Sequence, residues 1–510
     1  MTGNPTTGNP TTGHPTRARL GATMVLVGLL AAIGAGVGIG VPALSGEPGA
    51  RAAVDEPQYL LSALSLAEDG DLDISDELAE ARAVPYHPGA LPVQTAAQPD
   101  GSQLSPHDPL LAVLLAPAVA VGGWVGAKVL LAAVGGLLAA LLVWVAVRRF
   151  AVPPLLAAAV VGVAATSAPL SVYGQQVYPE LPAALAVLAA VAALTGQLAR
   201  GGLATLVLAV VALPWLSVKY APVAAVLALL GLAALWRVGR LRTATVLATG
   251  WGLVGVMFVW VHRLLYGGWT AYASGDHFQT SGELGVVGFS PDYAGRSTRL
   301  VGLLVDRDFG LVAWQPAWVL AVPALASLPW LLPRSRRRHD VVGGWPVLVA
   351  PVVAGWLVAA FVALTMHGYW FPGRQLVVVL PLAVLAVSVW LATLLSETTG
   401  SGRWLLLGGS GLLGAAGVAT YGWLLVAGWR GQLGWVDAPD QQAPVALATI
   451  RAVLPDYRVL DVTTWWLHAG WTVALLALAA LGIRHARKTT GPPSAPVITP
   501  PTLQPTGQQR

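Results

Sequence analysis

The sequence predicts an all-α polytopic membrane protein, because it is strongly apolar, carries few charges and is rich in tryptophan. Of its 510 residues, 55% are hydrophobic and only 10% are charged, and 21 are Trp. The charged fraction lies far below the ~25% that is typical of soluble domains. The mean hydropathy of +0.67 places the chain in the multi-pass membrane class.

The predicted spans follow from the length of each apolar run, because a helix needs about 20 apolar residues to cross the hydrocarbon core. We expect about twelve, at 20–43, 124–147, 153–170, 180–198, 202–217, 221–236, 243–264, 310–332, 342–365, 375–395, 404–427 and 465–483. The run 109–121 is too short to cross and is expected to be a half-helix at the surface. The run 20–43 is longer than the apolar part of a usual signal peptide, so an uncleaved first span is preferred over that alternative.

The charges predict the orientation of these spans. With both termini in the cytoplasm, 16 of the 29 basic residues lie on short cytoplasmic loops and tails, and 22 of the 24 acids lie outside. The first regularity is the positive-inside rule. The basic excess is therefore a signal of topology and does not indicate a nucleic-acid partner. We expect disordered cytoplasmic tails at 1–19 and 491–510, and a membrane domain at 20–490.

Two further features of the composition limit the class of protein. The chain has no cysteine, which excludes disulfides and thiolate metal sites. Only three of its 29 basic residues are Lys, and Ala, Val, Leu and Gly dominate, a composition typical of a GC-rich bacterial genome. The expected location is the bacterial cytoplasmic membrane.

The first external loop, 44–123, contains an unusual run of acids, with eight between Asp55 and Glu77. Asp55 and Glu56 precede Pro57 and an amphipathic pattern that includes Tyr59, so they lie at the predicted start of a helix, where a carboxylate stays ionised. A carboxylate at the boundary of water and lipid suits a general base that acts on a lipid-borne substrate. The spacing also fits a simple helix cap with a solvated neighbour. The later run "EDGDLDISDE" indicates a solvated loop, with weak cation binding as the alternative.

Several segments resemble the GT-C class of polyprenyl-phosphate-sugar-dependent glycosyltransferases, such as protein O-mannosyltransferases and the aminoarabinose transferase of lipid A. They occur in the expected order over about residues 20–395 and read "DEPQY", "LLSALSLAEDGDLDI", "YHPGALP", "SPHDPLLAVLLAPAVAVGGWVGAKVL", "VYGQQVYPELPAALAVL", "LLVDRDFGLVAWQPAWVLAVPAL" and "HGYWFPGRQLVVVLPLAVLAV". The resemblance implies a GT-C-like fold in which 44–123 is a catalytic loop with short interfacial helices.

The resemblance also implies a reaction and its catalytic residues. A sugar would pass from a polyprenyl-phosphate donor to an external protein, lipid or cell-wall glycan. Asp55 would be the general base and Glu56 a supporting acid. Related transferases often carry Arg where this chain has Gln58, so a contact to the donor phosphate must come from elsewhere.

The reaction needs cations for the leaving phosphate and a groove for the prenyl tail. Candidates for binding the donor phosphate or sugar are Tyr59, Tyr178, Glu180, Lys219, Arg296, Arg299, His367 and Arg374. Trp269, Tyr272, Trp314, Tyr369 and Trp370 are candidates for stacking on a sugar ring.

Each charged candidate also has a simpler interpretation. Lys219 could extend to the membrane surface, Arg374 could anchor an aromatic belt, and Glu180 could be an ordinary helix-start acid. Arg296 and Arg299 could pair with Asp292.

No cofactor is required by the sequence, although a divalent cation such as Mg²⁺ or Mn²⁺ remains an alternative. His87, His107 and Asp108 could bind a metal together with Glu180, but turn or surface roles are favoured, because no tight ligand spacing is visible.

A polyprenyl-linked glycan flippase or transporter, or a polymerase, is the alternative function. Transporters tend to place charges near the bilayer midplane and to repeat their halves. In this sequence the charges gather at the outer surface and no repeat is visible. Polymerases usually place their long loop late in the chain, whereas here the long acidic loop comes first.

Overall fold

The computed structural model of the chain describes residues 17–92, 94–95, 97–276, 291–332, 344–436 and 445–489. Within these ranges the regular structure is helical, and one isolated β-bridge joins Asp73 to Leu104. The all-α prediction is therefore confirmed for the described part of the chain. Residues 1–16 and the whole predicted tail 491–510 lie outside it.

Seven helical runs among the described residues are long and apolar enough to cross a membrane. They are α1 (Arg17–Gly36) with η1 (Val37–Gly40), α4 (Leu110–Phe150), η2 (Val218–Tyr220) with α9 (Ala221–Arg237), α10 (Leu241–Tyr266), α17 (Leu380–Glu397), α18 (Gly400–Trp429) and α20 (Val462–Thr489). These helices support a multi-pass membrane protein.

The other five predicted spans coincide with shorter apolar helices. These are α5 (Pro154–Ala165), α7 (Glu180–Leu194), α8 (Arg200–Leu216), η3 (Pro316–Leu320) with α15 (Ala321–Leu331), and α16 (Pro346–Leu357) with the π-helical η4 (Val358–Val362). A helix of 12 residues, such as α5, rises only about 18 Å and does not span the ~30 Å hydrocarbon core by itself. The count of twelve spans stays a prediction.

The remaining helices are short and lie in the connections. They are α2 (Glu56–Glu68), α3 (Ser75–Ala79), α6 (Leu170–Tyr173), α11 (Ala273–Asp276), α12 (Tyr293–Arg296), α13 (Arg299–Val305), α14 (Leu311–Trp314), η5 (Arg374–Leu376) and α19 (Val445–Ala452). Two of them, α2 and α3, belong to the loop 44–123, which was predicted to carry short helices.

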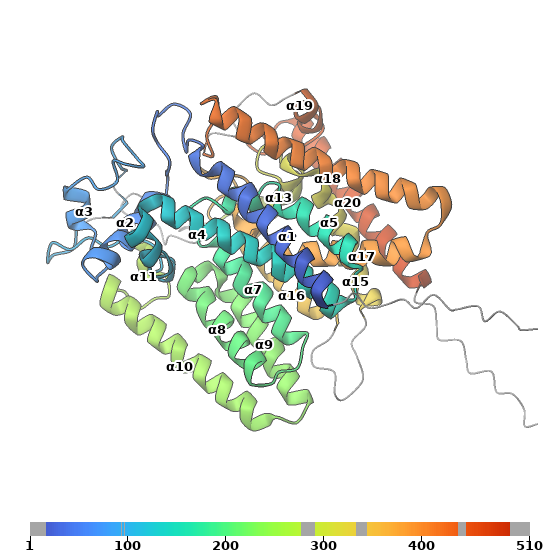
Figure 1. Cartoon of the computed structure of the whole chain (residues 1–510), viewed down its shortest axis with the longest axis horizontal. Coiled ribbons are helices and arrows are strands. Elements are labelled where there is room, and N and C mark those ends of the chain that lie inside the picture. Colours follow the sequence, from blue (N-terminus) through green and yellow to red (C-terminus); the bar gives the residue numbers. More distant parts are fainter. Residues whose placement is uncertain are drawn as a thin grey trace, which may run out of the picture.

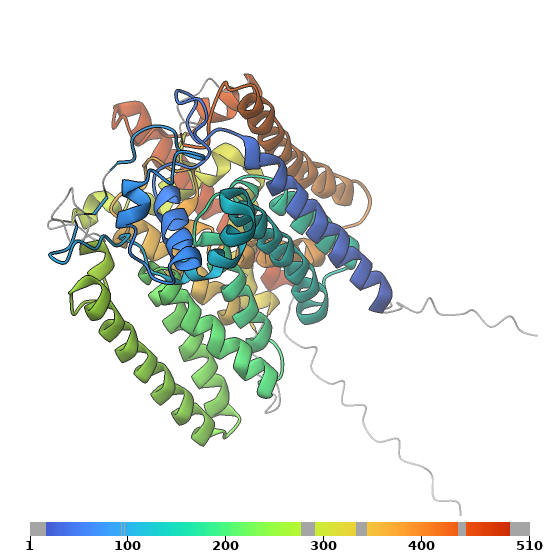
Figure 2. The same cartoon turned by 60° about the vertical axis from the view of Figure 1, so that its left-hand side comes forward.

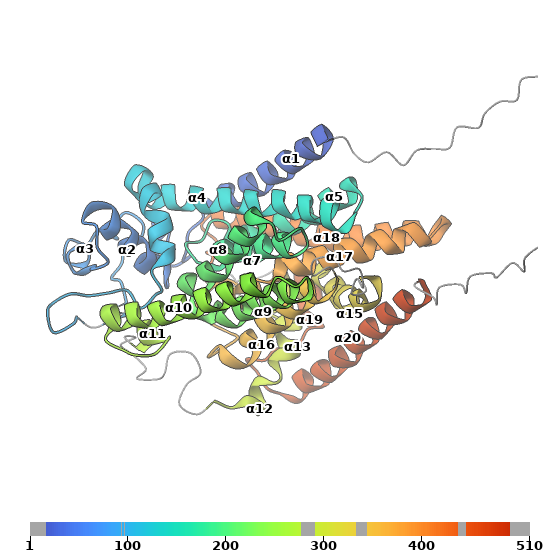
Figure 3. The same ribbon diagram turned by 90° about the horizontal axis from the view of Figure 1, so that it is seen from below.

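The helices are arranged so that α2 and α3 lie at one end of the molecule and both described termini lie at the other (Figures 1 and 2). The start of α1 and the end of α20 share that opposite end (Figure 3). Helix α4 packs against α1, α2, α5 and α7 and so connects the loop to the helical bundle. The predicted topology requires this separation of the acidic loop from the two termini.

Helix α10 lies at the periphery and has few buried side chains. Its exposed residues are large and apolar, with Val246 69% exposed, Leu253 66% and Trp260 54%. Such a surface is unfavourable in water, whereas lipid tails solvate it well. The outer face of α10 is therefore a lipid-facing surface.

A kink divides α4 into two parts at Gly123, whose φ of 54° and ψ of −147° are not helical. The first part covers the predicted half-helix 109–121, and the second covers the predicted span 124–147. A side chain is strongly disfavoured in this backbone conformation, whereas glycine adopts it without a Cβ clash. The structure therefore divides this helix between the two predicted segments, and the position of its first part at the membrane surface stays a prediction.

Helices α1 and α4 cross closely at two glycines. A Cβ atom at Gly136 would lie 2.7 Å from the backbone oxygen of Gly28, and a Cβ atom at Gly28 would lie 2.9 Å from the backbone oxygen of Gly136. Small residues permit such close approach of helices in membranes.

We expect the Gly136→Ala variant to be less stable than the wild type by about 1–3 kcal/mol, because the added methyl group separates α1 from α4. The measurement is unfolding of the purified chain in detergent. Gly162→Ala in α5 is the matched control, because nothing lies within 4 Å of a Cβ atom there. Equal effects of the two variants would contradict this account of the crossing.

Candidate functional site

The candidate site is built around the first turn of α2. Asp55 is the N-cap residue of this helix, but its side chain makes no capping hydrogen bond. Its Oδ2 atom instead lies 2.8 Å from Nη2 of Arg374. The preceding residue, Val54, has φ = 60°, a conformation that is costly for a β-branched residue and is often found at functional sites. Asp55 therefore occupies the N-cap position that the sequence suggested, but its carboxylate binds Arg374 and does not cap the helix.

Glu56 points the other way, into the protein, and is 1% exposed. Its Oε1 atom accepts a hydrogen bond from the backbone N–H of Val177 at 2.8 Å and lies 3.2 Å from Nζ of Lys128. Its Oε2 atom accepts one from the N–H of Ala53, and Lys128 donates to the carbonyl of Arg51 at 2.6 Å. Glu56 and Lys128 thus hold the backbone that leads into Asp55.

Arg374 connects the loop acid to two other predicted residues. Its Nε atom donates a hydrogen bond to Oε1 of Glu180 at 2.9 Å, and the same oxygen accepts a hydrogen bond from Nζ of Lys219 at 2.7 Å. Glu180 is completely buried, whereas the side chain of Lys219 is 22% exposed. Asp55, Arg374, Glu180 and Lys219 form one ionic network, and their formal charges sum to zero. The sequence predicted all four, from segments far apart in the chain.

Aromatic rings surround this network. The Arg374 guanidinium lies 4.1 Å from the ring centre of Tyr178 and 5.2 Å from that of Trp370. Tyr59 stacks on His107 with ring centres 4.3 Å apart and meets Tyr178 edge-on. The packing restricts Arg374 to one orientation, in which it can present a planar set of donors to an anion.

A cavity of about 260 Å³ lies beside the network. Tyr59, His107, Ser217, Lys219, Tyr272, Val358, Val362, Trp370 and Arg374 are among the residues that line it. Of the aromatic residues predicted to stack on sugar, Tyr272 and Trp370 reach the cavity. Asp55 is 14% exposed and is not among the residues that line the cavity; it contacts Arg374, which does line it.

Asp108 and His262 form a second buried pair at the wall of this cavity. Asp108 lines the cavity, and its Oδ1 atom lies 2.8 Å from Nε2 of His262. Its Oδ2 atom accepts a hydrogen bond from the N–H of Val218 at 2.8 Å. Val218 directly precedes Lys219, so this bond holds the backbone next to Lys219. The sequence suggested turn or surface roles for Asp108, but this residue is 5% exposed and orders the backbone that carries Lys219.

The structure does not bring every predicted phosphate ligand to the cavity. Arg296 donates to the carbonyl of Phe361 at 2.7 Å, and Arg299 donates to those of Ala363 and Leu364 at 2.6 and 2.9 Å. The last carbonyls of a helix lack partners within the helix, and these two arginines satisfy carbonyls that follow α16. Because Ala363 and Leu364 line the cavity, the arginines support its wall.

His367 also has a different partner from the expected phosphate. Its Nε2 atom lies 3.2 Å from Oδ2 of Asp306, and its ring meets Phe309 edge-on. Asp306 further accepts backbone hydrogen bonds from Asp308 and Phe309. His367 therefore belongs to a separate polar cluster that fixes the start of the segment leading to α14.

Gln58 occupies the position at which related transferases often carry arginine. It is 4% exposed, and its Oε1 atom has no hydrogen-bond partner in the part of the chain that the structure describes. Arg374, from a distant part of the chain, provides the cation beside Asp55 instead.

The ionic network determines the protonation of Asp55. Burial alone raises the pKa of its carboxyl group, but the charge of Arg374, with smaller contributions from His107 and Lys219, outweighs burial and lowers the pKa below its ordinary value. The side chain of Asp55 is therefore ionised at neutral pH. Its low pKa also makes this carboxylate a weak base for as long as Arg374 is bound to it.

This lowered pKa predicts how stability depends on pH. The unfolded chain has an ordinary Asp pKa of about 3.9, so the Asp55–Arg374 pair stabilises the fold fully above that pH and is lost as the pH falls through the lower folded value. We expect the thermal midpoints of the wild type and Asp55→Asn to differ by a constant amount from pH 7 to about pH 5 and to converge in stronger acid. A difference that grows on acidification would contradict the ion pair.

Sequence reasoning missed Lys128 and His262, which lie inside the apolar runs of α4 and α10. The sequence did contain one indication, because an ionisable residue within a membrane span is rare and usually has a functional or structural role. The partner of each residue comes from the loop 44–123, and that pairing cannot be read from sequence spacing.

Comparison with known proteins gives no further guide. No protein-family model, curated protein or solved structure matches the chain.

Proposed function

We propose that this chain is an integral membrane glycosyltransferase that moves a sugar from a polyprenyl-phosphate donor to an acceptor outside the cytoplasmic membrane. The observation that carries the proposal is the Asp55–Arg374–Glu180–Lys219 network beside an aromatic-lined cavity. It combines two carboxylates, two cations and rings suited to a sugar, at the end of the molecule that holds the acidic loop.

Lys219 and Arg374 are the proposed ligands of the donor phosphate. Both line the cavity and share one carboxylate oxygen of Glu180. They are therefore held close together by one carboxylate, and Arg374 has Asp55 as a second partner. Cations placed in this way stabilise the charge that develops on a leaving phosphate. Val358 and Val362, one helical turn apart on the same wall, provide apolar contact for the first carbons of the prenyl chain.

Asp55 is the proposed general base. When the donor phosphate binds Arg374, it competes with the Asp55 carboxylate for the guanidinium. Loss of that partner raises the basicity of Asp55 at the moment when the donor is in place. The carboxylate then takes the proton of an acceptor hydroxyl group, the acceptor oxygen forms a bond to the anomeric carbon, and the bond from that carbon to the phosphate oxygen breaks. Polyprenyl phosphate leaves with the electron pair.

Transfer of labelled sugar tests the proposal against the transporter alternative. The purified chain in lipid vesicles receives a short-chain polyprenyl-phosphate sugar with a labelled sugar and an envelope extract as the source of acceptor. We expect the label to leave the lipid fraction as unlabelled polyprenyl phosphate accumulates. Label that crosses the bilayer while still attached to the prenyl phosphate would instead identify a flippase.

A deletion strain provides the matching observation in cells. Loss of the transferase should cause the lipid-linked sugar to accumulate and one envelope glycan to disappear, as read by mass spectrometry. A deletion strain with unchanged lipid-linked sugars and glycans would contradict the proposal.

A further inference from the structure

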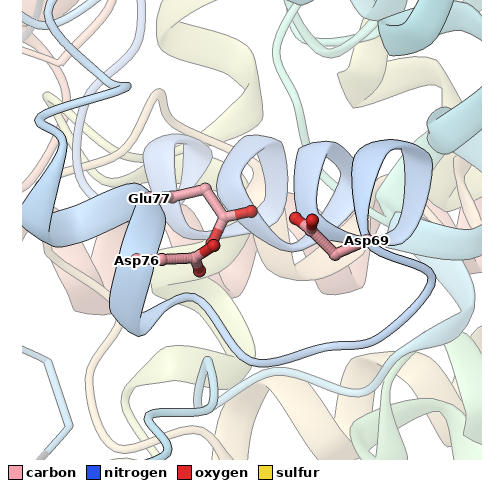
Figure 4. Close-up of side chains that lie close together, drawn as sticks. All are labelled: Asp69, Asp76 and Glu77. Atoms are coloured by element: carbon pink, nitrogen blue, oxygen red, sulfur yellow. The ribbon is translucent and has the colours of Figure 1, made fainter.

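Three carboxylates converge where α2 meets α3, at the end of α2 that is remote from Asp55 (Figure 4). Asp69 is the C-cap residue of α2, and Asp76 and Glu77 lie in the first turn of α3. One oxygen atom from each of the three carboxylates lies within 4.8 Å of the other two. Three negative charges at this distance repel one another unless a positive charge lies between them.

Glu77 distinguishes this cluster from an ordinary solvated acidic loop. It is only 2% exposed, and among the described residues no N–H or hydroxyl group donates to either of its two carboxylate oxygens. Its side chain points toward the carboxylates of Asp69 and Asp76 (Figure 4). An ionised carboxylate that is buried without a partner lowers the stability of the fold. A cation among the three carboxylates removes this cost.

The nearest basic side chain does not fill this role. Arg82 donates from its Nη2 atom to both carboxylate oxygens of Glu68, at 2.6 and 2.8 Å, and from Nη1 to Glu80 at 3.4 Å. Two other acids of the loop are also occupied. Asp71 accepts hydrogen bonds from Ser65 and a backbone N–H, and Asp73 accepts two backbone N–H groups. These bonds shape the turn that brings α3 back to the end of α2.

We propose that Asp69, Asp76 and Glu77 bind one calcium ion. The site offers only carboxylate oxygens, which lie within 4.8 Å of one another. Such oxygens with added water suit the flexible coordination of Ca²⁺, whereas Mg²⁺ demands near-ideal octahedral geometry and is seldom held by an all-protein cage. Asp69 and Asp76 are exposed, so water can complete the coordination. Sites of this kind in external modules have dissociation constants of about 10⁻⁴–10⁻³ M.

The ion has a structural role that is independent of the proposed sugar transfer. It ties α3 to the C-terminal end of α2, and Asp55 caps the other end of the same helix. Burial, and secondarily the neighbouring Asp76, raise the pKa of Glu77 to about 8, so a proton shared between these two carboxyl groups is the competing explanation for their proximity.

Calcium titration of the full-length chain tests the site. The purified protein in nanodiscs is freed of divalent ions with a chelator, and Ca²⁺ is added while heat of binding and the thermal midpoint are recorded. We expect one site per chain and a midpoint that rises with Ca²⁺ concentration. Glu77→Gln should weaken Ca²⁺ binding by about tenfold or more, because it removes one of three ligand charges.

The matched control is Glu80→Gln, which removes a charge from the same segment at a side chain outside the cluster. Its affinity for Ca²⁺ should stay within about twofold of the wild type, since the effect of a solvated charge is small. Asp69→Asn, at an exposed helix end, provides a second variant if Glu77→Gln does not fold. Absence of Ca²⁺ binding to the wild type, or equal binding by wild type and Glu77→Gln, would overturn the proposal and favour a shared proton.

Discussion

Replacing Asp55 by asparagine is expected to reduce the rate of sugar transfer by about 10²–10⁴-fold, the range that general-base catalysis supplies. Asparagine has nearly the shape of aspartate and can still accept a hydrogen bond from Arg374, but it cannot take a proton from the acceptor. The loss should therefore appear in kcat, while the affinity for the prenyl-phosphate donor stays the same or increases, because Arg374 loses its competing carboxylate.

The measurement is single-turnover transfer from labelled donor, together with donor binding at equilibrium. Asp100→Asn is the matched control, because Asp100 is an exposed acid of the same loop that bonds only to Ser102 among the described residues. Its transfer rate should equal that of the wild type. Full activity in Asp55→Asn would show that another group accepts the proton and would leave Asp55 a structural partner of Arg374.

Replacing Lys128 by methionine is expected to cost about 3–5 kcal/mol of stability, the effect of removing one partner from a buried ion pair. Lys128 is fully buried, and Glu56, its partner at 3.2 Å, is 1% exposed. Methionine fills much of the space of the lysine side chain, so the loss isolates the charge and the hydrogen bond to Arg51. Because the Glu56–Lys128 pair holds the backbone that leads into Asp55, transfer activity should also fall.

Unfolding of the purified chain in detergent measures this effect, and Lys488→Met is its control. Lys488 is exposed near the end of α20, so its replacement should change stability by less than about 0.5 kcal/mol. A Lys128→Met variant as stable as the control would contradict the role given to the Glu56–Lys128 pair.

The sequence carried the features that depend on local composition. Apolar runs predicted the all-α class and the positions of the helices, and Pro57 with its preceding acids marked the start of α2. The half-helix before Gly123 followed from length alone. The number of spans is harder to predict from the sequence, because a helix such as α5 is apolar enough to lie in a membrane but too short to cross it.

The candidate site could be predicted only in part. Asp55 was selected because it lies at the predicted start of a helix in the first external loop, and Glu180, Lys219 and Arg374 because each lies near the predicted outer end of a span. Such reasoning gives depth in the membrane. It does not give the angular position of a helix around the bundle. Arg296 and Arg299 were selected as cations on the predicted external side, yet in the structure they bind the carbonyls after α16.

Two residues near the site were hidden for a different reason. Lys128 is a single charge within an apolar run, and its significance depends on Glu56, which comes from another segment. His262 likewise acquires its role from Asp108. Long-range pairing of this kind follows from packing and has no local pattern in the sequence.

A structure of the protein with a short-chain polyprenyl phosphate bound tests the central claim most directly. We predict that the phosphate lies between Arg374 and Lys219, that the Asp55–Arg374 contact of 2.8 Å is broken, and that the freed carboxylate faces the cavity. A phosphate bound elsewhere, with the Asp55–Arg374 pair intact and Asp55 still covered, would contradict the claim that this carboxylate is the base for sugar transfer.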